Sequence, residues 1–209
     1  MTDAAQHADL ERHDLRARLW ARAHHEAAHA VVGTLLGAHV KGVEIWSGPP
    51  VAGRVQITGL DDAAAGSHGL VRRIVYALSG PIAEQIARGG SGMIMNEPAS
   101  LAASALLTAV RDPSTIDQGT DLGTVAQLIL DHFGSDDENA IAAAVDHLPL
   151  NVESLVREQW SNIQLVVASL LRHGSISEEQ FQSLVSLALP AGPPSDLYEA
   201  LPARSDPSL

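Results

Sequence analysis

Two histidines stand four residues apart in "RAHHEAAHAVVG", the stretch from Arg22 to Gly33. His25, Glu26 and His29 form the pattern H-E-x-x-H, and residues at i and i+4 of a helix share one face. His25 and His29 can therefore hold one metal ion together, while Glu26 lies beside that ion without binding it. The neighbouring His24 points about a third of a turn away, so we expect it at the surface or behind the ligands.

This pattern is typical of hydrolysis by metal-activated water. Zinc lowers the pKa of a water molecule that it binds towards about 7. Glu26 can accept the proton of that water, and the resulting hydroxide can attack an amide carbonyl. Zinc and the protonated glutamate can then stabilise the tetrahedral intermediate and the leaving amine. We predict one Zn2+ ion per chain, with His25 and His29 as ligands and Glu26 as the catalytic base; zinc is preferred over other divalent ions from the ligand types alone.

A catalytic zinc site needs a third protein ligand. The chain has no cysteine, so this ligand must be a histidine, an aspartate or a glutamate. Asp121 opens a predicted helix over 121–133 and stands one turn before Val125 on its apolar side. A carboxylate that faces a core must be paired or must coordinate something, which favours Asp121 as the ligand. Alternatively, Asp121 or Thr120 only caps that helix.

Other carboxylates compete for the same role. An "NE" pair at Asn96 and Glu97 follows the motif, and thermolysin-like peptidases use a glutamate as third ligand after such a pair. Glu97 also precedes Pro98 at a predicted helix start, where a carboxylate favours the helix dipole without any metal. We rank Asp121 above Glu97, and both above Asp112 and Asp117.

Composition limits the remaining function classes. The chain has 209 residues, of which 45 % are hydrophobic and 3 % aromatic, which favours one globular domain of packed helices. The formal net charge of −12 argues against binding nucleic acid. The longest apolar block, "AVVGTLLGA", is too short to span a bilayer, and the polar start of the chain is no signal peptide. We expect a cytoplasmic protein without a membrane span.

The apolar periodicity predicts a mainly α fold with a small β hairpin or sheet after the motif helix. A helix is expected from about Asp14 to Gly37, followed by strands over 39–46 and 51–58 around "SGPP". Residues 1–13 are expected to be a flexible N-terminus and the Pro-rich residues 190–209 a disordered tail, leaving one domain over 14–189.

Further helices are predicted along the rest of the chain. Pro81 either kinks a helix over "SHGLVRRIVYALSGPIAEQIARGG" or lies in the first turn of a new one. An Ala-rich helix is expected from about Pro98 to Arg111, and a short one over "DDENAIAAAVDHL". Next come a longer helix capped by Asn151 and stopped by Gly174, and a last one beginning with Ser177 and Gln180 at capping-box spacing.

Four segments over roughly residues 20–188 resemble the FtsH-type zinc metallopeptidases. "HHEAAHAVVG" is similar to that family's "HEAGHAxxG", "ALSGPIAEQIA" to its "xLxGRxAEEL", and "DQGTDLGTVAQLI" to its "GAxNDLxxATxxA". "WSNIQLVVASLLRHGSISEEQFQSLV" resembles its closing helices. The resemblance implies a helical metallopeptidase domain in which His25, His29 and Asp121 are zinc ligands and Glu26 is the base. It also places Glu84 where it could hydrogen-bond a ligand imidazole; alternatively, Glu84 is an exposed helix residue.

The chain departs from that family in three ways. Ala28 replaces the usual glycine inside the motif, which adds one methyl group. About 20 extra residues lie between the Glu84 segment and Asp121 and could shape or cover the cleft. No phosphate-binding G-x-x-x-x-G-K-[ST] motif is present, Lys41 is the only lysine, and the ATPase module and membrane helices of the family are missing.

The leading prediction is a zinc-dependent endopeptidase without its own ATPase. Such an enzyme could cleave unfolded or flexible segments, cut one dedicated partner, or work with a separate ATPase or as a homo-oligomer. The edge of the predicted hairpin could hold an extended peptide by strand addition. One alternative is a non-catalytic zinc-binding or partner-binding module derived from the peptidase fold. Another is a metal-dependent hydrolase that acts on other bonds.

Overall fold

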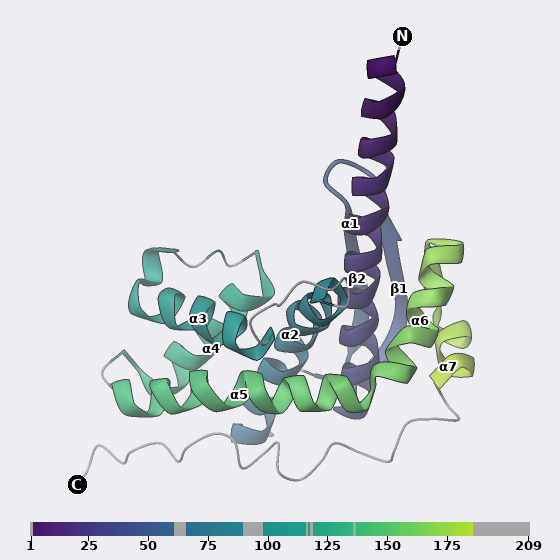
Figure 1. Cartoon of the computed structure of the whole chain (residues 1–209). Coiled ribbons are helices and arrows are strands. Elements are labelled where there is room, and N and C mark those ends of the chain that lie inside the picture. Colours follow the sequence, from purple (N-terminus) through teal and green to yellow (C-terminus); the bar gives the residue numbers. More distant parts are fainter. Residues whose placement is uncertain are drawn as a thin grey trace, which may run out of the picture.

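The computed structural model describes residues 2–60, 66–89, 98–115, 117, 119–135 and 137–185. Over this part of the chain the protein is mainly helical with one small antiparallel sheet, which confirms the predicted fold class (Figure 1). The α-helices are α1 (Thr2–Leu35), α2 (Gly66–Gly89), α3 (Pro98–Arg111), α4 (Asp121–Phe133), α5 (Glu138–Glu158), α6 (Trp160–His173) and α7 (Glu178–Val185), with a short 3-10 helix, η2 (Pro113–Thr115). The predicted tail and the Asn96–Glu97 pair lie outside the described residues.

The sheet has three strands in the order β2-β1-β3. Strands β1 (His39–Trp46) and β2 (Ala52–Thr58) form the predicted antiparallel hairpin, with His39 opposite Thr58 and Trp46 opposite Ala52. Strand β3 (Ser175–Ser177) pairs antiparallel with the other side of β1. The sequence did not predict β3, because three residues are too few to show alternation. Strand β2 is left at one edge of the sheet.

Helix α1 begins at Thr2, twelve residues earlier than the apolar periodicity predicts. The prediction of a helix start near Asp14 was wrong because it relied on apolar periodicity, and the added residues whose side chains the structure describes, His7 and residues 9–13, are all exposed. Contacts one turn apart in this stretch, between His7 and Glu11 and between Arg12 and Asp9, support the helix instead. The helix ends at Leu35, and Gly37 follows with a positive φ of 83°.

Helix α2 runs without interruption through Pro81, so no new helix starts there. The helices after Asp121 divide differently from the prediction. Asn151 is no cap: it lies inside α5, and the break falls at Gln159. Leu148 and Val152 are both buried, so one apolar face continues across Pro149 and Asn151. Gly174 ends α6 in the left-handed region, as predicted.

The predicted capping box at the start of α7 is confirmed. The Ser177 N–H donates to Gln180 Oε1 at 2.9 Å, and the Gln180 N–H donates to Ser177 Oγ at 3.4 Å.

Helix α1 passes through the centre of the molecule. It contacts α2 on one side and the sheet and α6 on the other, while α3, α4 and α5 pack beyond α2 (Figure 1). The extra helix α3 is fixed to α5 by Glu153, whose Oε2 accepts the Ala99 N–H at 2.8 Å. Within the described ranges, no helix combines the length and the apolar character needed to cross a membrane.

Candidate metal centre

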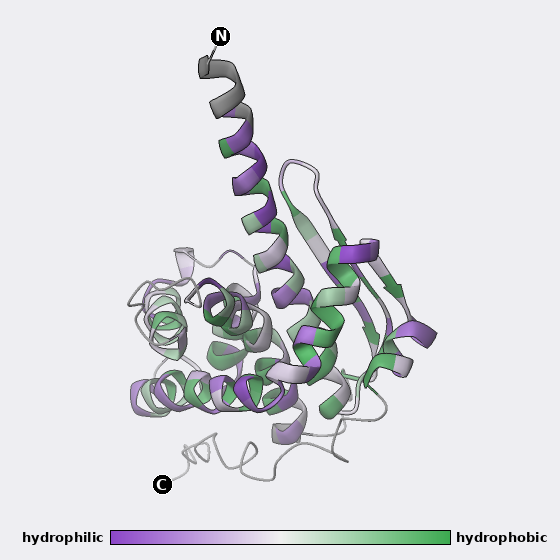
Figure 2. Cartoon of the chain, turned by 45° about the vertical axis from the view of Figure 1, so that its right-hand side comes forward, coloured by the Kyte–Doolittle hydropathy of each residue, from purple (hydrophilic) through white to green (hydrophobic). Residues whose placement is uncertain are grey.

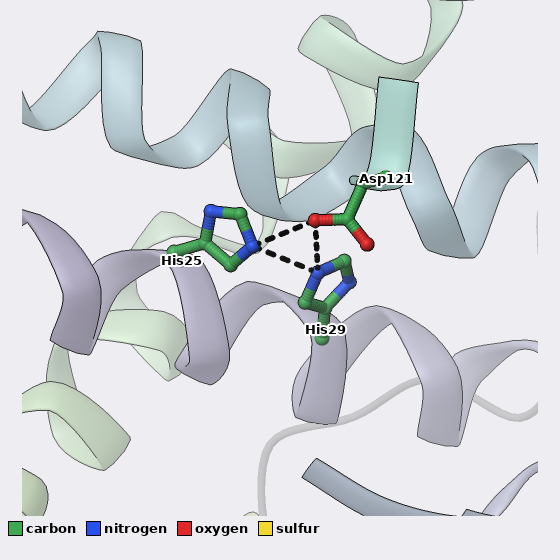
Figure 3. Close-up of side chains that lie close together, drawn as sticks. All are labelled: His25, His29 and Asp121. Carbon is green, nitrogen blue, oxygen red and sulfur yellow. Dashed lines mark hydrogen bonds and ion pairs between the residues drawn. The ribbon is translucent and has the colours of Figure 1, made fainter. Parts of the chain in front are cut away.

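His25, His29 and Asp121 come together at one point between α1 and the start of α4 (Figure 3). The Asp121 Oδ2 atom lies 2.9 Å from His25 Nε2 and 3.3 Å from His29 Nε2. The two Nε2 atoms are 3.1 Å apart. Both histidines are buried and Asp121 is partly exposed, so the cluster lies at the edge of the core. The predicted ligands are therefore brought together, although 92 residues separate His29 from Asp121.

The cap of α4 explains why the Asp121 carboxylate is available. Thr120 is the N-cap residue, and its Oγ1 accepts the Gly123 N–H at 3.1 Å. Thr120 therefore caps the helix. The sequence alone left open whether Thr120 or Asp121 does so. Asp121 occupies the first helical position with both carboxylate oxygens free of the cap, and its side chain turns towards α1.

Each histidine has its second ring nitrogen held by an acceptor on α2. His25 Nδ1–H donates to Glu84 Oε2 at 3.0 Å, so Glu84 contacts this imidazole as predicted and is not an exposed helix residue. His29 Nδ1–H donates to the Tyr76 carbonyl at 2.8 Å, with Ser79 Oγ at 3.3 Å. With Nδ1–H bonded in this way, a neutral ring has its lone pair on Nε2, so both rings have the orientation of metal ligands.

Gly80 leaves the space in which the two Nε2 atoms meet. A Cβ atom at this position would lie 2.4 Å from His29 Nε2 and 2.7 Å from His25 Nε2, so no side chain fits there. The donor set of two imidazoles and one carboxylate is the usual one for a catalytic zinc ion. The donor atoms, their fixed tautomers and the space at Gly80 all fit a zinc ion.

The ionisable groups of the cluster shift one another's pKa values. Burial alone would lower the pKa of His25, but hydrogen bonds with Asp121 and Glu84 raise it to about 9. Burial alone would raise the pKa of both carboxyl groups. The hydrogen bond with His25 instead lowers the pKa of Glu84 to about 2, and the hydrogen bonds with His25 and His29 hold that of Asp121 well below its usual value. Without a metal, a protonated His25 thus lies between two ionised carboxylates, Glu84 and Asp121.

Glu26 is buried beside the cluster and makes few polar contacts. It is 4 % exposed, and among the described residues it has one hydrogen-bonding partner, Arg22, at 3.4 Å. Strand β2 lies directly against it: a Cβ atom at Gly53 would be 2.6 Å from Glu26 Cγ and 2.9 Å from Oε1. The carboxylate is therefore held between α1 and the edge strand of the sheet.

The remaining predicted residues take no part in the cluster. His24 is fully buried, which corrects the expectation of a surface position. Its Nδ1–H donates to the Trp20 carbonyl and its Nε2 accepts from Gln164, both at 2.8 Å, and its ring stacks on Trp160. Glu97, the rival ligand, lies outside the described residues.

The two other aspartates stabilise local turns. Asp112 Oδ1 accepts a hydrogen bond from the Ser114 backbone N–H, and Asp117 Oδ1 accepts one from the Gly119 N–H.

Sequence reasoning missed three residues around the cluster: Tyr76, Gly80 and Gly53. The Tyr76 ring packs on the His29 ring, with 4.7 Å between their centroids. Gly80 lies in the quoted segment "ALSGPIAEQIA", so a signal for it was present. Gly53 and Tyr76 had none, because only the tertiary packing brings β2 to Glu26 and the Tyr76 ring to His29.

Comparisons with known proteins give no assignment. No protein-family model matches the chain, and a search of the curated proteins finds no match.

Proposed function

We propose that this chain is a zinc-dependent endopeptidase of the FtsH type, with His25, His29 and Asp121 as the ligands and Glu26 as the general base. The main observation in support of this proposal is that three donor atoms lie within 3.3 Å of one another: His25 Nε2, His29 Nε2 and Asp121 Oδ2. Two of them come from one helix turn and the third from a distant helix start. Each imidazole also has its proton placed on the nitrogen that faces away.

Glu26 suits the role of base better than that of a structural residue. A buried carboxylate normally collects several hydrogen bonds, since leaving it short of partners is costly. Within the part of the chain that the structure describes, Glu26 has one long contact, to Arg22, so its oxygens retain capacity to accept a proton from water. A purely structural metal site would not need a buried carboxylate with so few hydrogen bonds beside the ligands.

A bound zinc ion would supply Lewis-acid chemistry, acidifying water and polarising a carbonyl group. The protein's own groups do the rest. Glu84 and the Tyr76 carbonyl keep the imidazoles oriented, and Glu26 accepts a proton and can return it to a leaving amine.

The edge strand supports a peptide as the substrate. Strand β2 has one side free of any partner strand among the described residues, and at Gly53 it passes directly over Glu26. An extended chain that adds to this edge would run past the base with its backbone hydrogen-bonded. The proposed substrates are unfolded or flexible segments, one dedicated partner, or chains delivered by a separate ATPase. A cytoplasmic location remains part of the same proposal.

The test compares the wild type with Glu26→Gln, using casein and a pool of quenched fluorescent peptides as probes. The amide of glutamine cannot act as a base, so hydrolysis should fall at least about 100-fold while zinc content stays at one per chain. Glu44→Gln, on β1 and outside the cluster, is the matched control and should keep full activity.

Either of two results would contradict the mechanism. Glu26→Gln could cleave at the wild-type rate, in which case Glu26 is not the base. The wild type could also bind zinc and leave every probe intact, in which case the non-catalytic zinc module becomes the better explanation.

A further inference from the structure

The first part of α1 extends beyond the rest of the molecule. Figures 1 and 2 show it reaching past the tip of the β1–β2 hairpin. All described side chains from His7 to Trp20 are exposed except Leu15 and Leu19, which are half-buried. Leu10 is 68 % exposed and Trp20 is 39 % exposed. A single helix of this length is marginal in water, because helices in proteins are stabilised mainly by packing.

The charges of this segment are segregated along its length. Residues 2–11 contain three acidic residues and no arginine, whereas residues 12–22 contain four arginines and one aspartate. Over 2–22 the charges cancel, so the rest of the chain carries the whole formal charge of −12. The projecting helix is thus a segment at which two copies of this acidic chain could meet without net repulsion.

We propose that the projecting part of α1, residues 2–20, is a self-association surface that pairs antiparallel with the same segment of a second copy. Antiparallel pairing places the acidic half of each helix against the basic half of the other. With residue 2 of one copy opposite residue 20 of the other, it also brings the Leu10 side chains of the two copies towards each other and covers an apolar side chain that the monomer leaves exposed. This inference is independent of the proposed function.

Geometry favours antiparallel over parallel pairing. Residues 2–20 span roughly 28 Å at 1.5 Å per residue, so antiparallel helices hold the two bodies at opposite ends of the pair. Parallel helices would place the two strongly acidic bodies side by side and would match like charges along the segment. Both effects oppose association in the parallel orientation.

The test measures the mass of the full chain by sedimentation over a roughly hundredfold concentration range. We expect the wild type to approach twice the chain mass of 22.0 kDa as concentration rises. Arg16→Glu with Arg18→Glu lowers the formal charge of residues 2–20 from −1 to −5, and Asp9→Arg with Glu11→Arg raises it to +3. Each double variant alone should dissociate at least about 10-fold more readily, and an equal mixture of the two should regain the dimer.

A matched control separates local charge from total charge. Arg111→Glu with Arg172→Glu changes the net charge by the same amount at exposed positions outside α1, and it should leave the dimer unchanged. Recovery in the mixture also excludes misfolding as the cause of dissociation in the single proteins.

Crosslinking tests the orientation, because the chain has no cysteine of its own. A mixture of His7→Cys and Ala17→Cys proteins should form a disulfide-linked heterodimer, whereas Ala17→Cys alone should not crosslink, because antiparallel pairing separates the two copies of residue 17 by roughly 18 Å. A wild type that remains at 22.0 kDa, or a dimer indifferent to Arg16→Glu with Arg18→Glu, overturns the proposal. Crosslinking of Ala17→Cys with itself overturns the antiparallel arrangement.

Discussion

Thr120 caps helix α4, and the neighbouring Asp121 contacts the histidines of α1. A single aspartate at the helix start could not place the same oxygens in both positions. The Thr120 hydroxyl accepts the Gly123 N–H at 3.1 Å, and the Asp121 carboxylate lies 2.9 Å from His25 Nε2. A carboxylate that capped the helix would have its oxygens turned towards the backbone. With the cap supplied by Thr120, Asp121 is left to complete the cluster.

Removal of the Asp121 carboxylate should therefore remove the metal. We expect about one zinc per wild-type chain by mass spectrometry and a sharp loss in Asp121→Ala, since two imidazoles alone hold zinc weakly. Asp117→Ala, in the same loop, is the control and should keep its zinc. Full zinc in Asp121→Ala would exclude this residue as an essential ligand and direct attention to Glu97.

Glu84 should strengthen zinc binding without being essential for it. Its carboxylate accepts the His25 Nδ1 proton at 3.0 Å, and loss of such a partner typically weakens metal binding about 10- to 100-fold. Glu84→Gln should show this weakening in a competition titration with a zinc chelator. Glu158→Gln, an exposed residue of α5, serves as the control. Equal zinc affinity in Glu84→Gln and the wild type would show that the hydrogen bond contributes nothing to binding.

Gly80 should tolerate no side chain. The Cβ atom of Gly80→Ala would lie 2.4 Å from His29 Nε2, so the ring must move and the donor atoms separate. We expect at least about a 10-fold loss of zinc affinity. Gly42→Ala is the comparison, because its Cβ atom meets nothing closer than 3.4 Å. Circular dichroism distinguishes a displaced ligand from a protein that fails to fold, and wild-type affinity in Gly80→Ala would contradict the steric argument.

Zinc binding should release a proton from His25. The pKa of this residue is raised to about 9 in the metal-free protein, so its imidazole is charged at neutral pH and must lose the proton to become a ligand. Apparent zinc affinity should therefore rise with pH up to about 9. Calorimetry in buffers of different ionisation enthalpy measures the proton directly. Affinity independent of pH over this range would show that His25 is already neutral.

The metal-free protein should lose stability over the same range. A pKa raised from 6.5 to about 9 stabilises the folded state fully below pH 6.5, and this contribution is lost as the pH rises through 9. Thermal unfolding in the presence of a chelator should show a falling midpoint across this window. In His25→Gln the decline should be smaller, because the coupled proton is absent.

His24 should make the protein sensitive to acid. Burial lowers its pKa below the usual 6.5, with the Trp20 carbonyl opposing the shift. Its stabilising contribution is therefore complete above pH 6.5 and is lost as the pH falls through the lowered value. Urea unfolding of the wild type and of His24→Leu should differ in their slope with pH below 6.5, with the variant flatter. Parallel curves would show that His24 does not titrate with unfolding.

The helical elements and the ligand-bearing residues followed from local patterns. Helices α3 and α4 were predicted with their observed bounds, because each has a clear apolar stripe between polar loops. The H-E-x-x-H motif predicted two ligands because spacing on one helix fixes their relative positions. Where a pattern was ambiguous, as at Pro81 and Asn151, burial against neighbouring elements decided whether the helix continued.

The sequence by itself determined a mainly helical chain with a metal-binding motif on its first helix and an aspartate at the start of a later one. It could not decide whether that aspartate caps its helix or faces the histidines, because both need the same oxygens. The tertiary structure decided this: Thr120 takes the cap, and α2 brings Glu84 and Gly80 against α1. Local spacing specifies groups on one helix, whereas the position of the Asp121 carboxylate and the supporting contacts depend on how distant helices pack.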